Sequence, residues 1–345
     1  MLRAFDARTR GLRERDVMAE VAALRRAAAA DPARADALFE AACACLPALP
    51  LKVQIQTTTR CNAACEMCPY PLVTAEPGFE HGTMDEARYL RILDQLRGSE
   101  VERLSLFLMN EPLLDRRLAS WIRHARAALP ATTLGLFSNG AALDAERAHA
   151  LADAGLDELC VSVHGFDPAT YERVMAGLSY ARVVRNLDEV LAAADAGALG
   201  AMQIHLVTGD LPEIARTREL APLRYQGRVL LKAFSNERAA VGVIPGLPSS
   251  IAAVSEGAGG CADDTPCQRL FVKLYVLATG DCVLCNVDWR RSVVLGRVGD
   301  PDGASVAEVW RGERYTEVRR EHFRGQFTRA AICARCDYAR VVDRE

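Results

Sequence analysis

The sequence lacks several features that would place it in a specialised class of protein. No apolar stretch approaches the ~20 residues that a membrane-spanning helix requires. The formal net charge is only −3, from 42 basic and 45 acidic side chains, and neither sign forms a long run. Residues 1–16 are charged throughout and have no apolar core of the kind found in signal peptides. We therefore expect a cytoplasmic protein with no membrane partner and no nucleic-acid partner.

The sequence does have many cysteines, twelve in 345 residues. In a reducing compartment, clustered cysteines more often bind metal or perform chemistry than form disulfides. Three of them form the tight CxxxCxxC pattern of residues 61–68. A second set lies near the end of the chain: Cys267, Cys285, Cys333 and Cys336. The other five follow neither pattern: Cys43, Cys45, Cys160, Cys261 and Cys282.

The patterning divides the chain into four parts. Residues 1–50 have helical patterning without a strand signal, which predicts an N-terminal helical extension. Residues 51–238 alternate six apolar runs with amphipathic helices, which predicts parallel strands joined by right-handed crossovers. Six units favour the α/β class with a partial (β/α)6 TIM barrel, open on one side. Residues 239–266 are rich in Gly, Pro, Ser and Ala and predict a linker. Residues 267–345 predict a small domain built from a β-hairpin and helices.

Local signals set the boundaries of the expected elements. The expected barrel strands are residues 53–58, 104–109, 133–138, 159–163, 202–207 and 229–234. A helix is expected over 84–97, with a capping box formed by Thr83 and Glu86. Helices are also expected over 115–129, after the cap Asp167, from the capping box at Ser305, and over 313–323. The expected hairpin pairs residues 271–277 with 282–286.

The CxxxCxxC pattern directly follows the first expected strand. In barrels of this type, the loops after the strands form the working face. Three thiolates at this spacing can hold three irons of a cube-shaped cluster and leave the fourth iron open to a small molecule. Taken alone, the pattern is also compatible with a zinc site or with chance.

Polar motifs follow the next three strands in the same position. They are Met109-Asn110-Glu111-Pro112, Ser138-Asn139-Gly140 and Ser162-Val163-His164-Gly165. Together with the cysteine motif, they make residues 51–236 resemble the radical S-adenosylmethionine (radical SAM) superfamily. The resemblance departs from the family pattern at Asn110, because two glycines usually precede the Glu-Pro pair there.

The resemblance implies a role for each of these residues. Cys61, Cys65 and Cys68 would hold a 4Fe-4S cluster, and S-adenosyl-L-methionine would chelate its open iron. Met67 would pack on the adenine and Glu111 would accept hydrogen bonds from the ammonium group of SAM. The remaining expected cofactor contacts are Asn110, Ser138, Asn139, Ser162 and His164.

The second cysteine set, with Gly280 between its first two members, resembles the Twitch/SPASM extension of radical SAM enzymes. The resemblance implies one auxiliary 4Fe-4S cluster on Cys267, Cys285, Cys333 and Cys336. The pairs Cys282-x-x-Cys285 and Cys333-x-x-Cys336 also suit a structural zinc ion, and spacing alone does not separate the two.

The same spacing most resembles the radical SAM dehydrogenases of aminoglycoside biosynthesis. It implies oxidation of a secondary alcohol in a sugar or aminocyclitol, with the auxiliary cluster as electron acceptor and a flavodoxin- or ferredoxin-type reductant as partner. The alternatives are a sugar epimerase, with a cysteine as hydrogen donor, and a ribosomal-peptide maturase. The maturase ranks lower because residues 1–50 lack the strands of a winged-helix recognition domain. A non-catalytic, metal-stabilised binding protein is the remote alternative.

The weakest expectations concern substrate contacts. The candidate catalytic residues are Cys160, Cys282 and Arg238, with Cys261 as a further possible hydrogen donor. Asn236, His205 and Lys232 are further candidates for the interior or mouth of the barrel.

Overall fold

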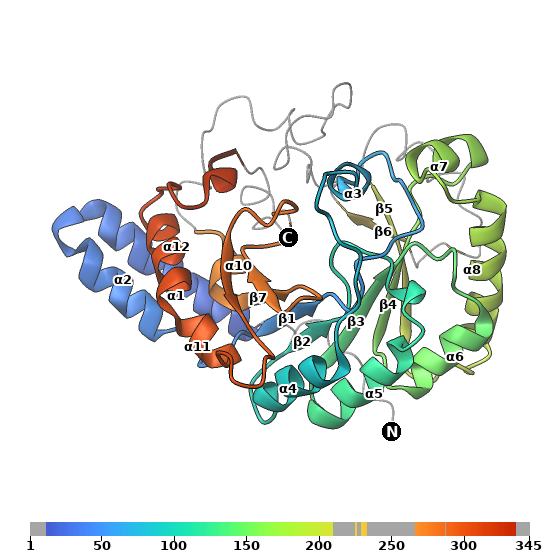
Figure 1. The fold of residues 1–345 in the computed structure, drawn as a ribbon, viewed down its shortest axis with the longest axis horizontal. Helices are drawn as coiled ribbons and strands as arrows, with labels where there is room; N and C mark the ends of the chain where they lie inside the picture. Colours follow the sequence, from blue (N-terminus) through green and yellow to red (C-terminus); the bar gives the residue numbers. More distant parts are fainter. Residues whose placement is uncertain (1–11, 210–224, 226–228, 233–265, 287, 336–345) are drawn as a thin grey trace.

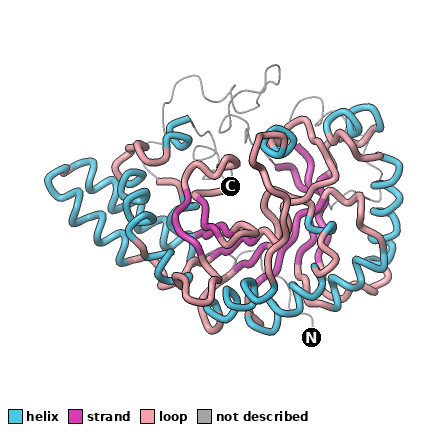
Figure 2. Tube along the Cα trace, viewed as in Figure 1, coloured by secondary structure: helices cyan, strands magenta, loops and turns pink. Residues whose placement is uncertain are grey.

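The structure is a computed structural model that describes residues 12–209, 225, 229–232, 266–286 and 288–335. One sheet forms the centre of the described part, with strand order β6-β5-β4-β3-β2-β1-β7-β8-β9. The strands are β1 Lys52–Ile55, β2 Arg103–Ser105, β3 Thr133–Ser138, β4 Glu158–Ser162, β5 Gln203–Gly209, β6 Val229–Lys232, β7 Lys273–Val276, β8 Asp281–Val283 and β9 Val294–Arg297. Figure 2 shows the curved sheet with helices along its outer side.

The helices of the barrel part are α3 Tyr70–Thr74, α4 Glu86–Leu96, α5 Leu118–Ala128, α6 Ala145–Asp153, α7 Pro168–Val174 and α8 Tyr180–Asp195. The helices outside it are α1 Leu12–Ala30, α2 Ala35–Ala44, α10 Gln268–Val272, α11 Val306–Arg311 and α12 Glu313–Phe323. Short 3-10 turns occur at Pro32–Arg34, Pro112–Leu114 and Ala331–Arg335. Helices α4, α5, α6 and α8 lie along the outside of the sheet (Figure 1). None of the helices in the described part is long and apolar enough to cross a membrane.

The predicted partial barrel is confirmed. Strands β1 to β6 pair in parallel, each with its neighbour in sequence, and helices separate the strands from β1 to β5 as expected. Most of the segment between β5 and β6 lies outside the described residues. The strand expected over residues 104–109 is shorter and ends at Ser105. The Asn110 side chain accepts a hydrogen bond from Leu108 N at 2.9 Å, and this local turn takes the chain out of the sheet.

The predicted cap of helix α4 is wrong. Asp85, rather than Thr83, is the N-cap, and its carboxylate accepts a hydrogen bond from Arg88 N at 3.0 Å. Thr83 forms an isolated antiparallel bridge with Thr58, which keeps it extended and outside the helix. The other two predicted caps are confirmed, with Asp167 capping α7 and a capping box at Ser305 opening α11.

The predicted C-terminal hairpin is present, but its first strand is shorter. Residues Gln268–Val272 form helix α10, and β7 starts at Lys273. Strand β7 pairs antiparallel with β8 and in parallel with β1, where Val53 faces Leu274. The hairpin therefore continues the barrel sheet instead of forming a sheet of its own.

The N-terminal extension is helical, as predicted, and joins the C-terminal helices. The Phe39 and Phe323 rings lie 5.6 Å apart in an edge-to-face contact. Arg311 donates to Leu46 O at 2.6 Å, and Trp310 Nε1 donates to Pro47 O at 3.2 Å. Helices α1 and α2 thus pack beside α11 and α12, as Figure 1 shows.

A buried arginine organises the C-terminal helices. Arg319 is 1% exposed and donates to Leu270 O and to Trp310 O, both at 2.7 Å. Its guanidinium lies 4.0 Å from the centre of the Trp310 ring and 4.5 Å from that of Tyr315. Burial lowers the pKa of Arg319 to about 10, so the group remains charged at neutral pH.

Replacing this arginine should destabilise the protein strongly. Arg319→Ala leaves two buried carbonyl oxygens without their donors and creates a cavity, so we expect a loss of about 3–5 kcal/mol in the free energy of unfolding. Urea denaturation measures it. The matched variant Arg314→Ala removes an exposed side chain and should cost less than about 0.5 kcal/mol. Equal losses in the two variants would contradict the assigned role of Arg319.

A buried histidine predicts a pH dependence of stability. Burial, together with the charge of Arg25, lowers the pKa of His322 from 6.5 to about 4. The folded state therefore binds this proton less readily than the unfolded state, and stability should fall by up to about 3 kcal/mol as the pH drops from 6.5 to below 4. His322→Gln should flatten this part of the stability curve measured by urea denaturation. The control His149→Gln, on the outside of α6, should follow the wild type. Parallel curves for all three proteins would refute the prediction.

Candidate functional site

A cavity of about 320 Å³ lies where the barrel strands end. We call it the inner cavity. Residues from the loops after β1, β2, β3 and β4 line it. The structure brings together here all ten residues expected to hold the first cluster and SAM: Cys61, Cys65, Cys68, Met67, Asn110, Glu111, Ser138, Asn139, Ser162 and His164.

The cysteine loop is fixed to the neighbouring loops. Ala64 N donates to Ala176 O at 2.7 Å, which ties it to the loop after α7. Asn139 Nδ2 donates to Asn62 Oδ1 at 2.8 Å, which ties it to the loop after β3. The three cysteines are thus held in place by contacts that do not involve a metal.

The thiols of this loop are partly screened from water. Burial is the main cause that raises the pKa of Cys61 to about 11 and that of Cys65 to about 12. The Cys68 sulfur accepts a hydrogen bond from Tyr70 N at 3.5 Å. Because metals bind the thiolate, loading of this site displaces protons.

Cysteine ligands of a cluster and of a single metal ion differ in their arrangement. Within the part of the chain that the structure describes, no three His, Cys, Asp or Glu side chains converge closely enough to hold one metal ion. A single zinc ion needs four ligands around one point, whereas a cube-shaped cluster spreads its cysteine ligands over separate irons. The three cysteines line one cavity, and their assignment to a 4Fe-4S cluster stays a prediction at this point.

Glu111 is a fixed carboxylate in the wall of the inner cavity. It is 1% exposed and accepts hydrogen bonds from Leu113 N at 3.0 Å, Ser138 Oγ at 2.8 Å and Asn139 N at 2.7 Å. Burial raises the pKa of Glu111, and these hydrogen bonds oppose the shift. Only Asn139 N donates to Oε2, so this oxygen can accept a further hydrogen bond from a ligand.

Asn110 offers a donor to the inner cavity. Its Nδ2 is buried and has no hydrogen-bond partner among the described residues. A buried donor without a partner is uncommon in folded proteins, and a bound ligand would supply the missing acceptor. The predicted contact of Asn110 with SAM fits this observation.

Another wall of the inner cavity comes from the C-terminal part, and the sequence did not predict it. It consists of Arg269, Lys273, Asn286 and Trp289. The available signal was proximity, since Arg269 lies two residues after Cys267 and Asn286 directly follows Cys285. Cys267 and Cys285 therefore each lie within two positions of a residue in this wall.

The described members of the second cysteine set lie at or beside the ends of short elements. Cys267 is the N-cap of α10, Cys285 is 8% exposed after β8, and Cys333 lies in the turn Ala331–Arg335. Cys336 lies outside the described residues. The zinc alternative needs Cys282, but that side chain is fully buried, with its sulfur 4.0 Å from Gly280 O.

Three of the remaining candidates have described side chains, and none of these three lines the inner cavity. Cys160 is 5% exposed on β4, and burial raises the pKa of the Cys282 thiol in the hairpin. Neither these cysteines nor His205 of β5 belongs to its wall. Lys232 ends β6. Candidates outside the described residues are Asn236, Arg238 and Cys261. The roles of all seven stay predictions.

Comparison with known families gives two matches along the chain. Residues 55–217 match the model of the radical SAM superfamily. Residues 267–337 match the model of the SPASM iron–sulfur cluster-binding domain. The two matches lie on either side of the predicted linker and include both cysteine sets.

Individual relatives and solved structures share low sequence identity with this chain. The chain is 25% identical over 325 residues to PqqA peptide cyclase from Rhodopseudomonas palustris, covering 85% of this chain and 81% of the relative. The fold resembles that of BtrN in complex with AdoMet and 2-DOIA, with a TM-score of 0.54, 17% identity, and coverage of 84% and 93% of the two chains. It also resembles Streptococcus suis SuiB bound to the precursor peptide SuiA, with a TM-score of 0.56, 14% identity, and coverage of 79% and 67%.

The Glu111 carboxylate can be tested directly. Glu111→Gln removes the negative charge that would face the ammonium group of SAM, so we expect SAM to bind at least about tenfold more weakly. Equilibrium dialysis with cluster-loaded protein measures this change. The control Glu146→Gln, in the exposed first turn of α6, should bind SAM as the wild type does. Unchanged affinity in a correctly folded Glu111→Gln protein would refute the contact.

Proposed function

Because this chain is a radical SAM enzyme with a C-terminal SPASM domain, we propose that it abstracts a hydrogen atom from an amino-acid side chain of a peptide. The observation that carries this proposal is the similarity to a PqqA peptide cyclase, which extends over 85% of the chain. This relative spans both domains, whereas the likeness to BtrN, at 17% identity, supports the fold alone.

The two domains imply three cofactors, which are SAM, a SAM-binding 4Fe-4S cluster and an auxiliary cluster. When bound, SAM and its cluster supply a carbon-centred radical that removes a hydrogen atom from the substrate. We assign Cys61, Cys65 and Cys68 to the SAM-binding cluster. The assignment is supported by their position on one cavity with Glu111 and Asn110.

We assign the auxiliary cluster to Cys267, Cys285, Cys333 and Cys336. Its proposed role is to accept an electron from the substrate, and a flavodoxin- or ferredoxin-type protein is the proposed reductant of the enzyme. The contiguity of Cys285 with the wall residue Asn286 supports electron transfer between this site and the inner cavity.

The wall of the inner cavity that comes from the C-terminal part favours a substrate that carries negative charge. Arg269 and Lys273 contribute basic side chains to the inner cavity, and Glu111 is the one carboxylate among the described residues that line it. A peptide can supply carboxylate groups, whereas an aminocyclitol is cationic at neutral pH. This charge pattern favours a peptide substrate. The cysteine spacing favours the other reading, in which the substrate is a sugar or aminocyclitol whose alcohol is oxidised.

Helices α1 and α2 do not supply a winged-helix recognition domain. Within residues 12–50 the structure describes helices and turns, and no strand. If the substrate is a peptide, its recognition must use another surface of the enzyme or another protein.

Substrate-dependent SAM cleavage tests the proposal. The reconstituted enzyme is incubated without oxygen with SAM, a reductant, and either synthetic peptides that include PqqA or the aminocyclitol 2-DOIA. We expect a peptide to stimulate formation of 5′-deoxyadenosine and to lose hydrogen atoms, as measured by chromatography and mass spectrometry. Stimulation by 2-DOIA and by none of the peptides would overturn the proposal in favour of alcohol oxidation.

Matched cysteine variants serve as controls for this assay. The triple variant Cys61→Ala, Cys65→Ala and Cys68→Ala should lose SAM cleavage and retain the iron of the auxiliary site. Cys45→Ala changes an exposed thiol at the end of α2 and should retain both. SAM cleavage by the triple variant would refute the assignment of the first cluster.

A further inference from the structure

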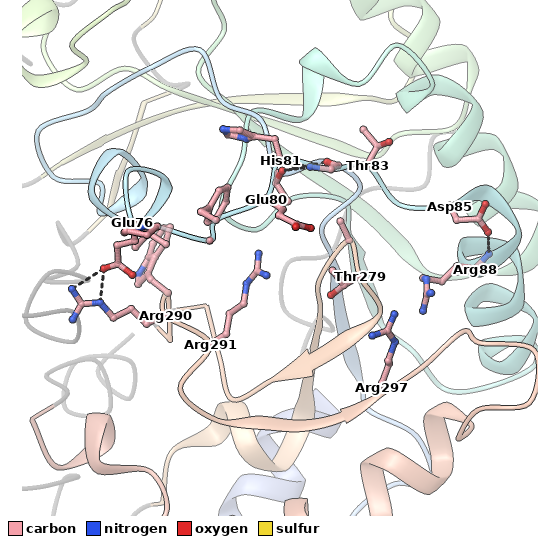
Figure 3. A pocket seen from close by; sticks show the side chains of 18 residues that line it. Glu76, Glu80, His81, Thr83, Asp85, Arg88, Thr279, Arg290, Arg291 and Arg297 are labelled. Carbon is pink, nitrogen blue, oxygen red and sulfur yellow. Dashed lines mark hydrogen bonds and ion pairs between the residues drawn. The ribbon is translucent and has the colours of Figure 1, made fainter.

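A second cavity, of about 510 Å³, lies beside the inner cavity. We call it the outer cavity. One side is the segment from Glu76 to Arg88, which follows the cysteine loop, and the other is the hairpin segment from Ala278 to Arg297 (Figure 3). Trp289 lines both cavities. The outer cavity therefore lies next to the site of the proposed chemistry.

Four arginines line the outer cavity, and three of them are held by carboxylates. Arg290 pairs with Glu76 at 2.9 Å. Arg88 and Arg297 both pair with Asp300, at 2.7 and 2.9 Å. Arg297 also pairs with Asp281 at 3.7 Å, so three carboxylates match these three positive charges.

The fourth arginine, Arg291, is different. It forms no ion pair with a described residue, and its guanidinium lies 5.7 Å from the centre of the Phe79 ring. It points into the outer cavity from the hairpin side, as Figure 3 shows. Burial lowers the pKa of Arg291, and the negative charge of Asp281 opposes only part of this shift.

The backbone of Arg291 is held in an unfavourable conformation. Its φ of 54° is the only positive value of a non-glycine residue in the described part of the chain. The buried Asp288 carboxylate fixes the turn, since it accepts hydrogen bonds from Ser292 N at 2.8 Å and Val293 N at 2.9 Å. Strain that is maintained by its surroundings is typical of functional positions.

The same turn presents a second donor. Trp289 is 6% exposed, and its Nε1 has no hydrogen-bond partner among the described residues. An indole N–H can only donate. Arg291 and Trp289 thus bring a positive charge and an unused donor to one cavity, which suits a ligand with negatively charged acceptor oxygens.

The acidic residues of the outer cavity leave this charge available. Glu76 is used by Arg290, and Asp85 caps helix α4. Glu80 is exposed and has no ion-pair partner among the described residues, so it is the carboxylate of the cavity wall that can compete for Arg291. Asp281 does not belong to this wall; its charge also acts on Arg291, and it pairs with Arg297 at 3.7 Å.

We propose that the outer cavity binds an acidic side chain of the peptide substrate, with Arg291 and Trp289 as donors to its carboxylate. The inference rests on the proposed function, since it names the class of peptide. Binding there would hold the substrate beside the inner cavity while another of its residues reaches the reacting position. Arg291 is in this sense a positioning residue.

The test measures peptide binding rather than turnover. Fluorescein-labelled Ser-Glu-Glu-Ser and Ser-Gln-Gln-Ser are titrated with cluster-loaded enzyme and SAM, without oxygen, and anisotropy reports binding. We expect the glutamate peptide to bind about tenfold more tightly than the glutamine peptide. Arg291→Gln should abolish the difference, and Glu80→Gln should increase it by removing the competing carboxylate. Arg182→Gln makes the same change at an exposed position at the start of α8 and should match the wild type.

A second variant separates binding from folding. Arg291→Gly removes the side chain and adopts the positive φ without strain, so the midpoint of thermal unfolding should not fall while the glutamate preference is lost. Retention of the preference in Arg291→Gln or Arg291→Gly overturns the inference. Equal competition by inorganic phosphate at the peptide's own concentration also overturns it, because the cavity would then take any small anion.

The outcomes separate this inference from the proposed function. Peptide turnover without a preference for the glutamate peptide overturns the acidic-substrate site alone. An Arg291-dependent preference in an enzyme that turns over 2-DOIA and no peptide overturns the proposed function and leaves the carboxylate site in place.

Discussion

The parallel pairing of β1 with β7 determines how this molecule is arranged. Strand β1 has β2 on one edge and β7 on the other, and Val53 is in register with both Leu104 and Leu274. The cysteine loop leaves the end of β1, and helix α10 with Cys267 leads into β7. One strand pairing therefore places the cysteine loop and the wall residues Arg269, Lys273 and Asn286 on one cavity, although about 200 residues separate them in sequence. Without this pairing, the C-terminal part would have no fixed position relative to the barrel mouth.

Hydrogen bonds between loops hold the site on this framework. Asn62 and Asn139 join the cysteine loop to the loop after β3, and the Glu111 carboxylate joins the loops after β2 and β3. Glycine is required at Gly140, where φ is 75° and an added Cβ would lie 2.7 Å from Val161 Cγ1. Since polar groups in this site bond mainly to one another, its geometry is set before any cofactor binds. Such preorganisation is what precise cofactor chemistry requires.

Much of the fold follows from local sequence signals, and the rest depends on contacts that such signals do not encode. Hydrophobic periodicity predicts the six barrel strands, and capping chemistry predicts the starts of α7 and α11. Thr83 and Asp85 are both good N-caps, and the bridge between Thr58 and Thr83 decides between them. The partner of β7 could not be predicted, because pairing between β1 and β7 is long-range. The predicted cofactor residues share a cavity because each follows its own strand, whereas the Arg269 and Trp289 wall depends on that long-range pairing.

The division of charge between the two walls has a consequence for how ligands are oriented. The barrel wall contributes the fixed carboxylate of Glu111, and the C-terminal wall contributes Arg269 and Lys273. A ligand with a cationic end and an anionic end is favoured in one direction between these walls, because the opposite direction brings like charges together in a partly desolvated space. The turn fixed by Asp288 extends the cationic side to the outer cavity through Trp289 and Arg291. The barrel therefore contributes the residues expected to bind the cofactors, and the C-terminal part contributes the Arg and Lys side chains of the inner cavity.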